Sequence, residues 1–243
     1  MFSDKDIEKA LDDYQKNPQD GLLIEPFDKS SLTPVGYDLR VGKQGFSWNK
    51  KSVIEIERDG KIQIDANDTV VIRTLESISL SKKVSATVHS IVSKIITKGL
   101  SDISTTIDPG WTGKLLISIH NNRNSSTELR FEERLCTVCF YRVDLASEAN
   151  RDTSNNREEL WEQLLGIARA EKERIEKEKN KEQQGIEKAN EFRTFLLIVL
   201  GVVALIVGIG ASIINPTIGA SIAAFLAVIA PIVYDRFLKP ISK

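Results

Sequence analysis

The 243-residue chain is poor in metal-binding side chains, with only 2 cysteines and 2 histidines. The cysteines, Cys136 and Cys139, form a single Cys-x-x-Cys pair. No second pair or neighbouring histidine completes a tetrahedral zinc site, so we expect no bound metal. Because residues three apart on a strand point to opposite faces, the pattern favours two small core or edge side chains over a redox pair.

An excess of either charge is absent as well. Lysine and arginine number 33 against 34 aspartates and glutamates, which leaves a formal net charge of -1. Such a balance does not provide the basic surface with which proteins bind nucleic acid, and we expect no nucleic-acid partner. The first residues, Met1-Phe2-Ser3-Asp4, are acidic rather than apolar, which argues against a cleavable signal peptide.

Charged side chains are missing altogether between Thr194 and Tyr234. The polar sequence Ile214-Asn215-Pro216-Thr217 divides this stretch into two apolar runs, each of about 20 residues, which is the length of a membrane-spanning helix. Backbone in lipid must satisfy its own hydrogen bonds, so we predict transmembrane helices over residues 193–214 and 218–238. The alternative, a hairpin buried in a soluble core, is disfavoured because both runs are apolar on every side.

Positive charge flanks these runs and is absent from the turn between them. Lys188 and Arg193 precede the first run, and Arg236, Lys239 and Lys243 follow the second. Because lysine and arginine favour the cytoplasmic side, the rest of the chain and the C-terminus are both expected in the cytoplasm. The spans contain no ionisable group, which argues against a proton relay or an ion transporter.

Residues 1–145 form a predicted β-rich domain. A short helix opens it, because Ser3 can cap and Asp6 stands in the capping-box position. Short, often alternating runs separated by turns predict strands at 53–57, 61–65, 69–74, 77–80, 85–90, 114–121, 127–131 and 135–143. Many short strands without intervening helices favour an all-β barrel or sandwich.

Residues 146–192 are predicted to be a linker and a charged helical stalk. Acidic and basic residues interleave at helical spacing, as in Glu171-Lys172-Glu173-Arg174, which is typical of a solvated helix. An apolar seam begins the stalk and then lapses, which leaves open whether the helix self-associates as a coiled coil. The seam comprises Trp161, Leu164, Leu165, Ala168 and Ile175. Gly185 is an expected weak point or bend.

Several motifs occur in an order that resembles the dCTP deaminase branch of the deoxyuridine triphosphatase superfamily. They are Ile24-Glu25-Pro26-Phe27, Leu32-Thr33-Pro34, Tyr37-Asp38-Leu39-Arg40-Val41-Gly42, the signature turn Thr105-Thr106-Ile107-Asp108-Pro109-Gly110-Trp111-Thr112-Gly113, and the closing strand from Glu133-Arg134-Leu135-Cys136 to Phe140. The resemblance covers most of residues 1–144, and its string Ile-Asp-Pro-Gly-Trp-x-Gly is the most specific part. It implies a distorted β-barrel or jelly roll, a homotrimer, and nucleotide pockets shared between neighbouring subunits.

The signature turn carries the first candidate site residue. Asp108 precedes Pro109, so its backbone is extended and its carboxylate is held at the end of a hairpin, where it could bind a sugar hydroxyl or orient a water. The alternative is an ordinary Asx role, in which the carboxylate accepts backbone hydrogen bonds of the turn. With the resemblance, the candidate nucleotide-binding residues are Ser93, Lys94, Lys98, Thr106, Ile107, Asp108 and Trp111.

The catalytic part of the family pattern is eroded in this chain. The resemblance implies a glutamate on the strand after the signature turn, but Ser118 occupies that position and has no suitable pKa for proton transfer. Asp108 and His120, which shares the strand face of Ser118, are the remaining catalytic candidates. The family's Arg-Ser-Ser phosphate-binding run reads Val92-Ser93-Lys94 here, without bidentate arginine geometry. These losses favour a β-rich domain that binds a nucleotide but no longer deaminates it.

Together these features predict a membrane-anchored nucleotide-binding sensor with a pseudoenzyme head. The arrangement is similar to prokaryotic antiphage defence effectors that join a nucleotide-sensing domain to membrane-disrupting helices, which would place it in a prokaryotic cell membrane. No cofactor is expected to be required, although Mg²⁺ could accompany a nucleoside triphosphate. The alternatives are a membrane-bound dCTP deaminase or dUTP pyrophosphatase, and a membrane scaffold that binds no nucleotide.

Overall fold

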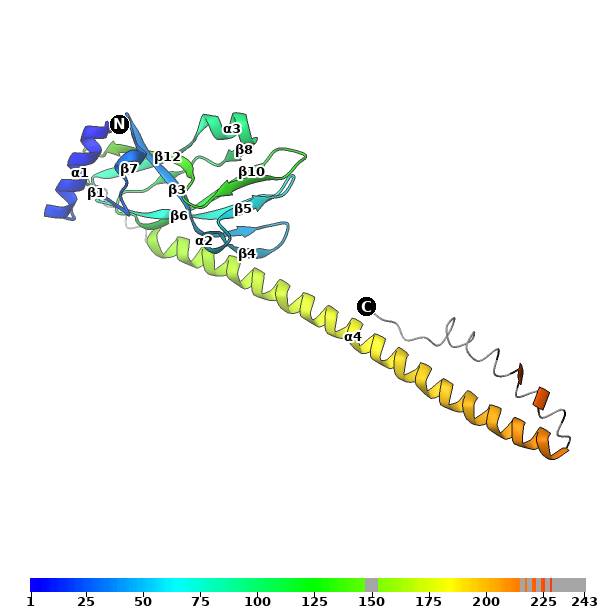
Figure 1. Ribbon diagram of the computed structural model, residues 1–243. Coiled ribbons are helices and arrows are strands. Elements are labelled where there is room, and N and C mark those ends of the chain that lie inside the picture. Colours follow the sequence, from blue (N-terminus) through cyan, green and yellow to red (C-terminus); the bar gives the residue numbers. More distant parts are fainter. Residues whose placement is uncertain (147–152, 215–216, 218–219, 222–223, 226–227, 229–243) are drawn as a thin grey trace. The chain divides into compact units, whose positions relative to one another are not determined.

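The computed structural model describes residues 1–146 and 153–214, and beyond them residues 217, 220–221, 224–225 and 228 (Figure 1). The chain divides into two compact units, Met1–Lys172 and Glu173–Lys243. One continuous helix, α4 (Thr153–Ile214), contributes to both units. We call the first of them the β unit.

The β unit begins with helix α1 (Asp4–Lys16), as predicted from its capping box. The Ser3 hydroxyl accepts a hydrogen bond from the Asp6 amide at 3.2 Å, and the Asp6 carboxylate accepts one from the Ser3 amide at 2.9 Å. Two amide groups that the helix leaves without partners are satisfied in this way. The apolar face of α1 buries Ile7, Ala10 and Leu11 against the sheet core.

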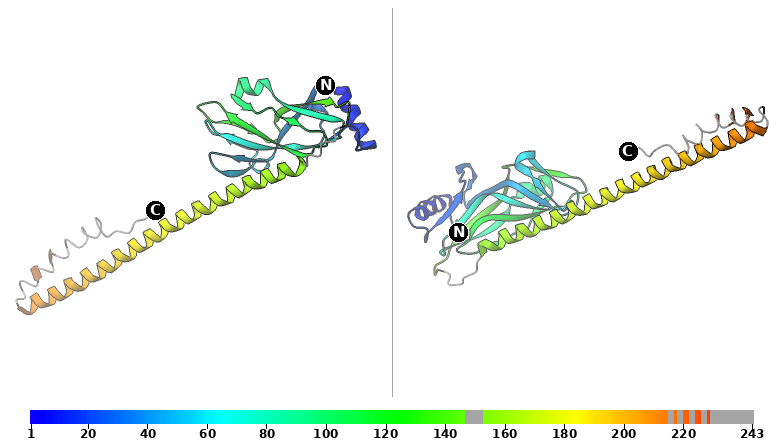
Figure 2. Two further views of the ribbon diagram at one scale, coloured as in Figure 1. Left: turned by 180° about the vertical axis from the view of Figure 1, so that it is seen from behind. Right: turned by 90° about the horizontal axis from the view of Figure 1, so that it is seen from below.

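The strands form one ten-stranded antiparallel sheet and a separate two-stranded ribbon. In the large sheet the order is β8-β10-β6-β3-β12-β7-β9, with β1 on β6 and with β2 and β4 on β3; the ribbon pairs β11 with β5. Figures 1 and 2 show the large sheet curling around its interior. The elements are β1 (Leu22–Glu25), a 3-10 turn (Lys29–Ser31), β2 (Leu32–Thr33), β3 (Gly36–Ser47), β4 (Ser52–Glu55), α2 (Ile56–Asp59), β5 (Lys61–Ile64), β6 (Thr69–Leu80), β7 (Val84–Ser90), α3 (Val92–Lys98), β8 (Leu100–Asp102), β9 (Thr106–Ile107), β10 (Thr112–Asn121), β11 (Thr127–Arg130) and β12 (Arg134–Arg142).

The predicted all-β head is confirmed, but the sequence analysis divided one strand and missed others. The segments expected at 69–74 and 77–80 are a single strand, β6, and the run expected at 53–57 becomes the short helix α2 after Glu55. β3, which contains the Tyr37–Gly42 motif, was not predicted. Most residues of β3 are buried on both faces, so this strand lacks the polar and apolar alternation by which a half-exposed strand is recognised.

Two register breaks occur opposite one another on the two sides of β6. The pairing with β3 shifts between Val41 and Gly45, and the pairing with β10 shifts between Lys114 and Leu116. Gly42 allows the chain to pass close to β6, since a Cβ at this position would lie 2.3 Å from the Arg73 carbonyl oxygen. Irregular pairing of this kind bends a strand and redirects its side chains.

Buried polar side chains of β6 form hydrogen bonds with backbone groups at these register breaks. The Thr74 hydroxyl accepts a hydrogen bond from the Leu115 amide at 3.0 Å and donates one to the Glu76 carbonyl oxygen at 2.7 Å. The Glu76 carboxylate, which is fully buried, accepts hydrogen bonds from the Arg40 backbone amide at 2.8 Å and from the Arg40 Nε at 2.6 Å. One carboxylate therefore joins β6 to β3 through both a backbone and a side-chain donor.

The first turns of α4 pack on the β unit. Trp161 is 2% exposed and forms a cluster with Leu164 and with Phe46 of β3. The Arg73 guanidinium lies 5.6 Å from the Trp161 ring centroid and forms an ion pair with Glu158. The sequence analysis left open a coiled-coil seam for Trp161 and Leu164, but an apolar seam does not identify its partner, and in the structure that partner is the sheet.

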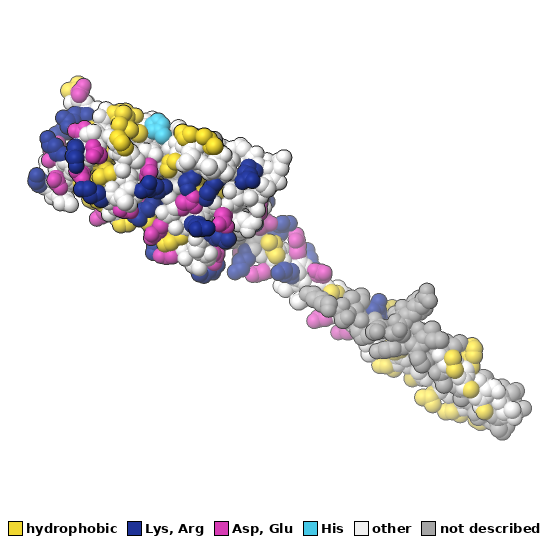
Figure 3. All heavy atoms as spheres, turned by 45° about the horizontal axis from the view of Figure 1, so that its top comes forward, with side chains coloured by type: hydrophobic (Ala, Val, Ile, Leu, Met, Phe, Trp, Pro, Cys, Tyr) yellow, Lys and Arg dark blue, Asp and Glu magenta, His cyan; other side chains and the backbone are white. Residues whose placement is uncertain are grey.

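The rest of α4 follows the predicted helix without interruption. Ile175 is exposed, and the helix continues through Gly185 with no break in its secondary structure. Within the described residues, one helix is long and apolar enough to cross a membrane, from Arg157 to Val207. Its apolar end exposes large hydrophobic side chains, visible in Figure 3. The predicted Asn215-Pro216 turn, most of the second span (218–238) and the C-terminus lie outside the described residues.

We predict that Arg40→Ala strongly destabilises the β unit. The substitution leaves the buried Glu76 carboxylate without its charged partner, and breaking a buried ion pair from one side costs about 3 to 5 kcal/mol. Urea unfolding of the full chain followed by tryptophan fluorescence measures the loss, since all 3 tryptophans lie in the β unit.

The matched control is Lys5→Ala, which removes the solvent-exposed ion pair with Glu8. Exposed pairs contribute little because water and salt screen them, so this variant is expected to unfold almost like the wild type. Equal unfolding midpoints for the Arg40 and Lys5 variants would contradict the assigned role of the buried pair.

Candidate functional site

The signature turn lies between β9 and β10 and is tied to the end of β6. The Asp108 carbonyl oxygen accepts the Trp111 amide at 3.2 Å, and the Trp111 carbonyl oxygen accepts the Leu80 amide at 2.8 Å. Gly110, with φ of +84°, provides the left-handed conformation that the turn requires. Trp111 is 4% exposed, so its ring belongs to the core and fixes the turn in place.

The Asp108 carboxylate is available to a ligand. The turn is closed by the backbone carbonyl of this residue, and no described side chain or amide hydrogen-bonds to its carboxylate. Asp108 is half-buried. The Arg157 guanidinium of α4 lies 5.7 Å from the ring centroid of Trp111. Thr106 and Ile107 of β9 precede Asp108 and pair with β7. These residues form one local group, as the sequence indicated.

The predicted alternation along β10 is confirmed. Leu115, Ile117 and Ile119 are buried, whereas Leu116, Ser118 and His120 are half-buried on the opposite face. Leu116 packs against the cluster that contains Trp161, so this face of β10 meets the first turns of α4.

The two polar residues on this face, Ser118 and His120, have different surroundings. Ser118 lies opposite Val71 in the pairing with β6, and its hydroxyl has no hydrogen-bond partner among the described residues. His120 Nδ1 lies 3.0 Å from the Thr69 hydroxyl. The histidine is therefore engaged with a neighbouring strand, as expected of a polar surface group.

The two lysines of α3 are held by one carboxylate. Lys98 Nζ lies 2.7 Å from Glu133 Oε1 and donates to the Glu128 carbonyl oxygen at 2.8 Å, and Lys94 forms an ion pair with the same carboxylate of Glu133. The sequence analysis treated these lysines as movable cations, but in the structure they are anchored. Ser93 is exposed at the start of the helix, and its carbonyl oxygen accepts the Thr97 hydroxyl.

The candidate residues thus fall into separate groups. Among the residues that the structure describes, no hydrogen bond or ion pair links Ser93, Lys94 or Lys98 to the signature turn.

The cysteines behave as core side chains. Cys136 and Cys139 are both free and buried in β12. Burial raises the pKa of each thiol, which opposes thiolate chemistry. In the described part of the chain, no three side chains of histidine, cysteine, aspartate or glutamate gather as a metal site.

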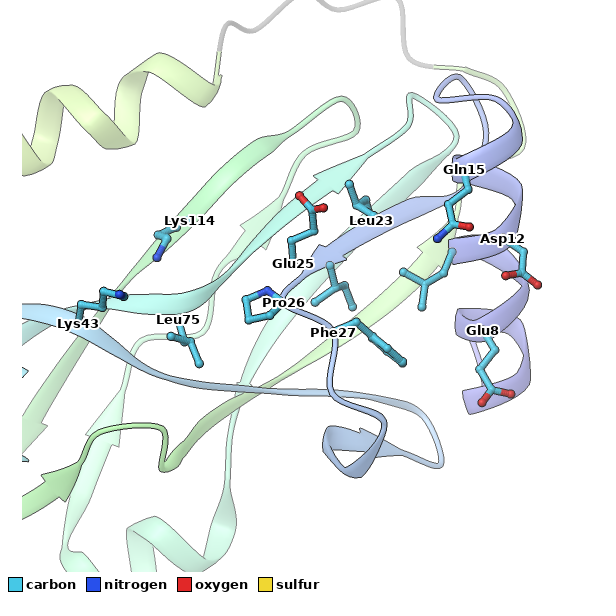
Figure 4. A pocket seen from close by; sticks show the side chains of 12 residues that line it. Glu8, Asp12, Gln15, Leu23, Glu25, Pro26, Phe27, Lys43, Leu75 and Lys114 are labelled. Atoms are coloured by element: carbon cyan, nitrogen blue, oxygen red, sulfur yellow. The ribbon is translucent and has the colours of Figure 1, made fainter. Parts of the chain in front are cut away.

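A groove that the sequence analysis missed lies between α1 and the sheet. It has a volume of about 1050 Å³, and Figure 4 shows Lys43 and Lys114 side by side at one end, with Glu8 and Asp12 of α1 at the other. Pro26 and other apolar side chains lie between the two ends. Nothing local in the sequence brings the two lysines together, because their placement depends on the register breaks beside β6.

Comparison with known proteins places the β unit in a family. A family model described as dCTP deaminase-like matches residues 1–143. The dCTP deaminase of Pyrococcus furiosus is 38% identical over 123 residues, which cover 51% of this chain and 77% of that protein. The dCTP deaminase of Pyrococcus horikoshii is 37% identical over the same length and with the same coverage.

Solved structures are similar at a greater distance. The crystal structure of 2'-deoxycytidine 5'-triphosphate deaminase from Agrobacterium tumefaciens matches with a TM-score of 0.48 and 19% identity; the match covers 58% of this chain and about half (47%) of that one. A mutant dUTPase from phage phi11 of S. aureus, whose structure shows a structural Mg(II) ion, matches with a TM-score of 0.38 and 13% identity, covering 54% of this chain and 96% of that one.

We predict that Glu133→Gln weakens the β unit most at neutral pH. Burial alone would raise the pKa of Glu133, but hydrogen bonds from Lys94 and Lys98 outweigh it and hold the pKa below its ordinary value of 4.5. A lowered pKa means that the carboxylate stabilises the fold above that value and ceases to do so as the pH falls through the folded-state pKa. We expect a loss of about 1 to 2 kcal/mol at pH 7, typical of hydrogen bonds to charged groups.

Urea unfolding of both proteins across a pH series measures this effect. The difference between wild type and variant should shrink as the pH falls below about 4.5. Glu8→Gln, in an exposed ion-pair cluster with Lys5 and Lys29, serves as a control with a smaller effect. A Glu133→Gln deficit that stays constant down to acid pH would refute the assignment.

Proposed function

The chain belongs to the dCTP deaminase-like family, and from that membership we propose that it is a membrane-anchored sensor whose β unit binds a nucleotide without deaminating it. The ligand occupies the signature turn, and α4 transmits its presence to the bilayer. The biological setting that fits such a device is prokaryotic antiphage defence, in which a change in nucleotides leads to membrane damage.

The observation that carries this proposal is the continuity of α4. Its first turns are part of the β unit, with Trp161 buried against Phe46 and with Glu158 paired to Arg73. The same unbroken helix ends in an apolar segment. In the proposed sensor, a change in how the first turns pack is passed along α4 to its apolar end.

Binding without deamination is supported by what lies on β10. Deamination needs a group that exchanges a proton near neutral pH, and loss of such a group commonly removes a factor of about 10² to 10⁴ in rate. Ser118 stands at the position expected of the glutamate, and His120 contacts Thr69 instead of an open site. Asp108, by contrast, keeps a free carboxylate suited to holding a sugar hydroxyl.

We further propose that the nucleotide pocket forms between copies in a homotrimer. In this arrangement one copy presents Thr106, Ile107, Asp108 and Trp111 of the signature turn, and the next copy presents α3. Val92 and Ile96 of α3, and Ile103 after β8, are exposed at 66%, 76% and 72%, which suits a surface covered by a neighbouring copy. Mg²⁺ would arrive with a nucleoside triphosphate.

Transmission to the membrane requires that the nucleotide distinguish two conformations. A ligand shifts an equilibrium only by its difference in affinity for the two states. The contact between α4 and the β unit supplies a candidate for the change, because it combines one buried aromatic ring with one ion pair at the surface. Three copies with two spans each would bring six helices together in the bilayer.

A membrane-bound dCTP deaminase or dUTP pyrophosphatase is the competing function. It is favoured by the 38% identity to the Pyrococcus furiosus deaminase, and it would assign water activation to Asp108. Nucleotide turnover discriminates between the two functions.

We predict that the apolar end of α4 inserts into lipid. An arginine at the centre of a membrane span costs about 2.5 to 3.5 kcal/mol, so Leu200→Arg combined with Val203→Arg should abolish insertion. Flotation of the full chain with liposomes measures insertion, and release of a trapped dye on addition of nucleotides measures damage. Wild-type protein is expected to float and to release dye with at least one nucleotide.

Ile175→Arg provides the control, since Ile175 is an exposed apolar residue on the charged part of the same helix. This variant should float like the wild type. Flotation of the double variant would remove the basis for a membrane anchor, and intact liposomes with every nucleotide tested would argue against the sensor.

We predict nucleotide binding without turnover. Full chain in detergent, incubated with each deoxynucleoside triphosphate and Mg²⁺, should retain a ligand by equilibrium dialysis and yield no deaminated or hydrolysed product by chromatography. Asp108→Asn should weaken that binding about tenfold or more, as expected on losing a charge-assisted hydrogen bond. Brisk product formation that Asp108→Asn abolishes would establish the enzyme instead.

A further inference from the structure

We propose that the groove between α1 and strands β3 and β10 is a second binding site, contained within one chain, for a small aromatic phosphate of the nucleotide class. Lys43 and Lys114 hold the phosphate, and the apolar wall formed by Pro26 and Phe27 receives the ring. The site is separate from the signature turn and does not depend on the function proposed for it.

The cationic end of the groove is an unusual concentration of like charge. Lys43 and Lys114 come from different strands and point to the same place (Figure 4). Lys114 is half-buried, and among the described residues no side chain or carbonyl hydrogen-bonds to its ammonium group. Lys43 forms an exposed ion pair with Glu57, with Nζ 2.9 Å from Oε1. The two ammonium groups repel each other unless an anion lies between them.

The local electrostatics support the same conclusion. Burial lowers the pKa of Lys114, and the neighbouring positive charges of Arg73 and Lys43 lower it further. Glu76 and Glu158 counteract this effect only in part. A phosphate group would supply the missing negative charge and accept hydrogen bonds from both amines.

The backbone explains why the lysines meet. Lys43 lies within the register break of β3, and Lys114 borders the break of β10, on the two sides of β6. In a regular ladder, side chains alternate between the two faces of the sheet. Such alternation does not by itself bring together two lysines whose strands are separated by a third strand. Register irregularities redirect side chains and are frequent beside binding sites. Buried Thr74 and Glu76 stabilise this geometry.

The remainder of the groove fits a ring and a sugar. Phe27 is 39% exposed and stacks on Tyr37, with ring centroids 5.6 Å apart, so its position is fixed while part of its surface stays open. Leu75 and Pro26 extend the apolar wall towards the lysines. At the far end, Glu8 and Asp12 of α1 provide carboxylate oxygens, and Glu25 provides another beside Pro26 (Figure 4). Carboxylates accept hydrogen bonds from hydroxyl or amino groups. A volume of about 1050 Å³ is at the upper end of the range of ligand pockets.

The experiment measures binding of phenyl phosphate, dCMP and inorganic phosphate to the full chain in detergent by isothermal titration calorimetry. We expect phenyl phosphate and dCMP to bind more tightly than inorganic phosphate, because only they contact the wall at Phe27. Lys43→Met combined with Lys114→Met should weaken phenyl phosphate binding about tenfold or more, the value of a lost charge-assisted hydrogen bond. Phe27→Ala should remove the advantage over inorganic phosphate.

Matched variants separate this site from the signature turn. Lys61→Met removes an exposed lysine of β5 and is expected to leave phenyl phosphate binding unchanged. Asp108→Asn should also leave it unchanged, whatever its effect on triphosphate binding. The double methionine variant should unfold at an equal or higher urea concentration than the wild type, since it removes like-charge repulsion, and this shows that lost binding does not reflect lost folding.

Three outcomes would overturn the proposal. The first is a wild-type protein that binds neither phenyl phosphate nor dCMP at millimolar concentration. The second is undiminished binding by the double methionine variant. The third is loss of phenyl phosphate binding in Asp108→Asn, which would assign the ligand to the signature turn.

Discussion

The buried carboxylate of Glu76 is the constraint on which the rest of the β unit depends. A charge without access to water must be paired and hydrogen-bonded, and Arg40 satisfies both needs with its backbone amide and its guanidinium. The pair of Glu76 and Arg40 therefore holds β3 against β6 at the position where the regular pairing of the two strands is interrupted. Thr74, two residues earlier, does the same for β10 by accepting the Leu115 amide. The two strands beside β6 are thus fixed by side chains where the backbone ladder cannot fix them.

The functional features of the β unit are arranged around the same strand. Arg73 directly precedes Thr74, and its side chain pairs with Glu158 and covers the Trp161 ring of α4. Leu80, at the other end of β6, holds the signature turn through the carbonyl of Trp111. The turn, the groove lysines and the contact with α4 therefore share one strand as their support.

The sequence predicts those parts of the structure that depend on near neighbours. The capping box of α1, the alternation along β10 and the turn at Asp108 each require only a few consecutive residues. β3 escaped recognition because burial on both faces removes its alternation. Lys94 and Lys98 were interpreted as free because their partner Glu133 lies 39 and 35 residues away. Likewise, the apolar seam at Trp161 reveals that something covers it, but only the fold shows that this is Phe46.

The same distinction bears on the proposal that the β unit binds a nucleotide without deaminating it. Recognition needs groups held in place, and the signature turn is held by backbone hydrogen bonds and by the buried ring of Trp111. Catalysis needs in addition a group that changes its protonation at the right point. The half-buried titratable side chains of β10 among the described residues are Lys114 and His120. Lys114 lines the groove beside α1, and the Thr69 hydroxyl lies 3.0 Å from Nδ1 of His120. The carboxylates of Glu76 and Glu133 are bound by Arg40 and by the lysines of α3, so neither can be released for proton transfer without breaking an interaction of the fold.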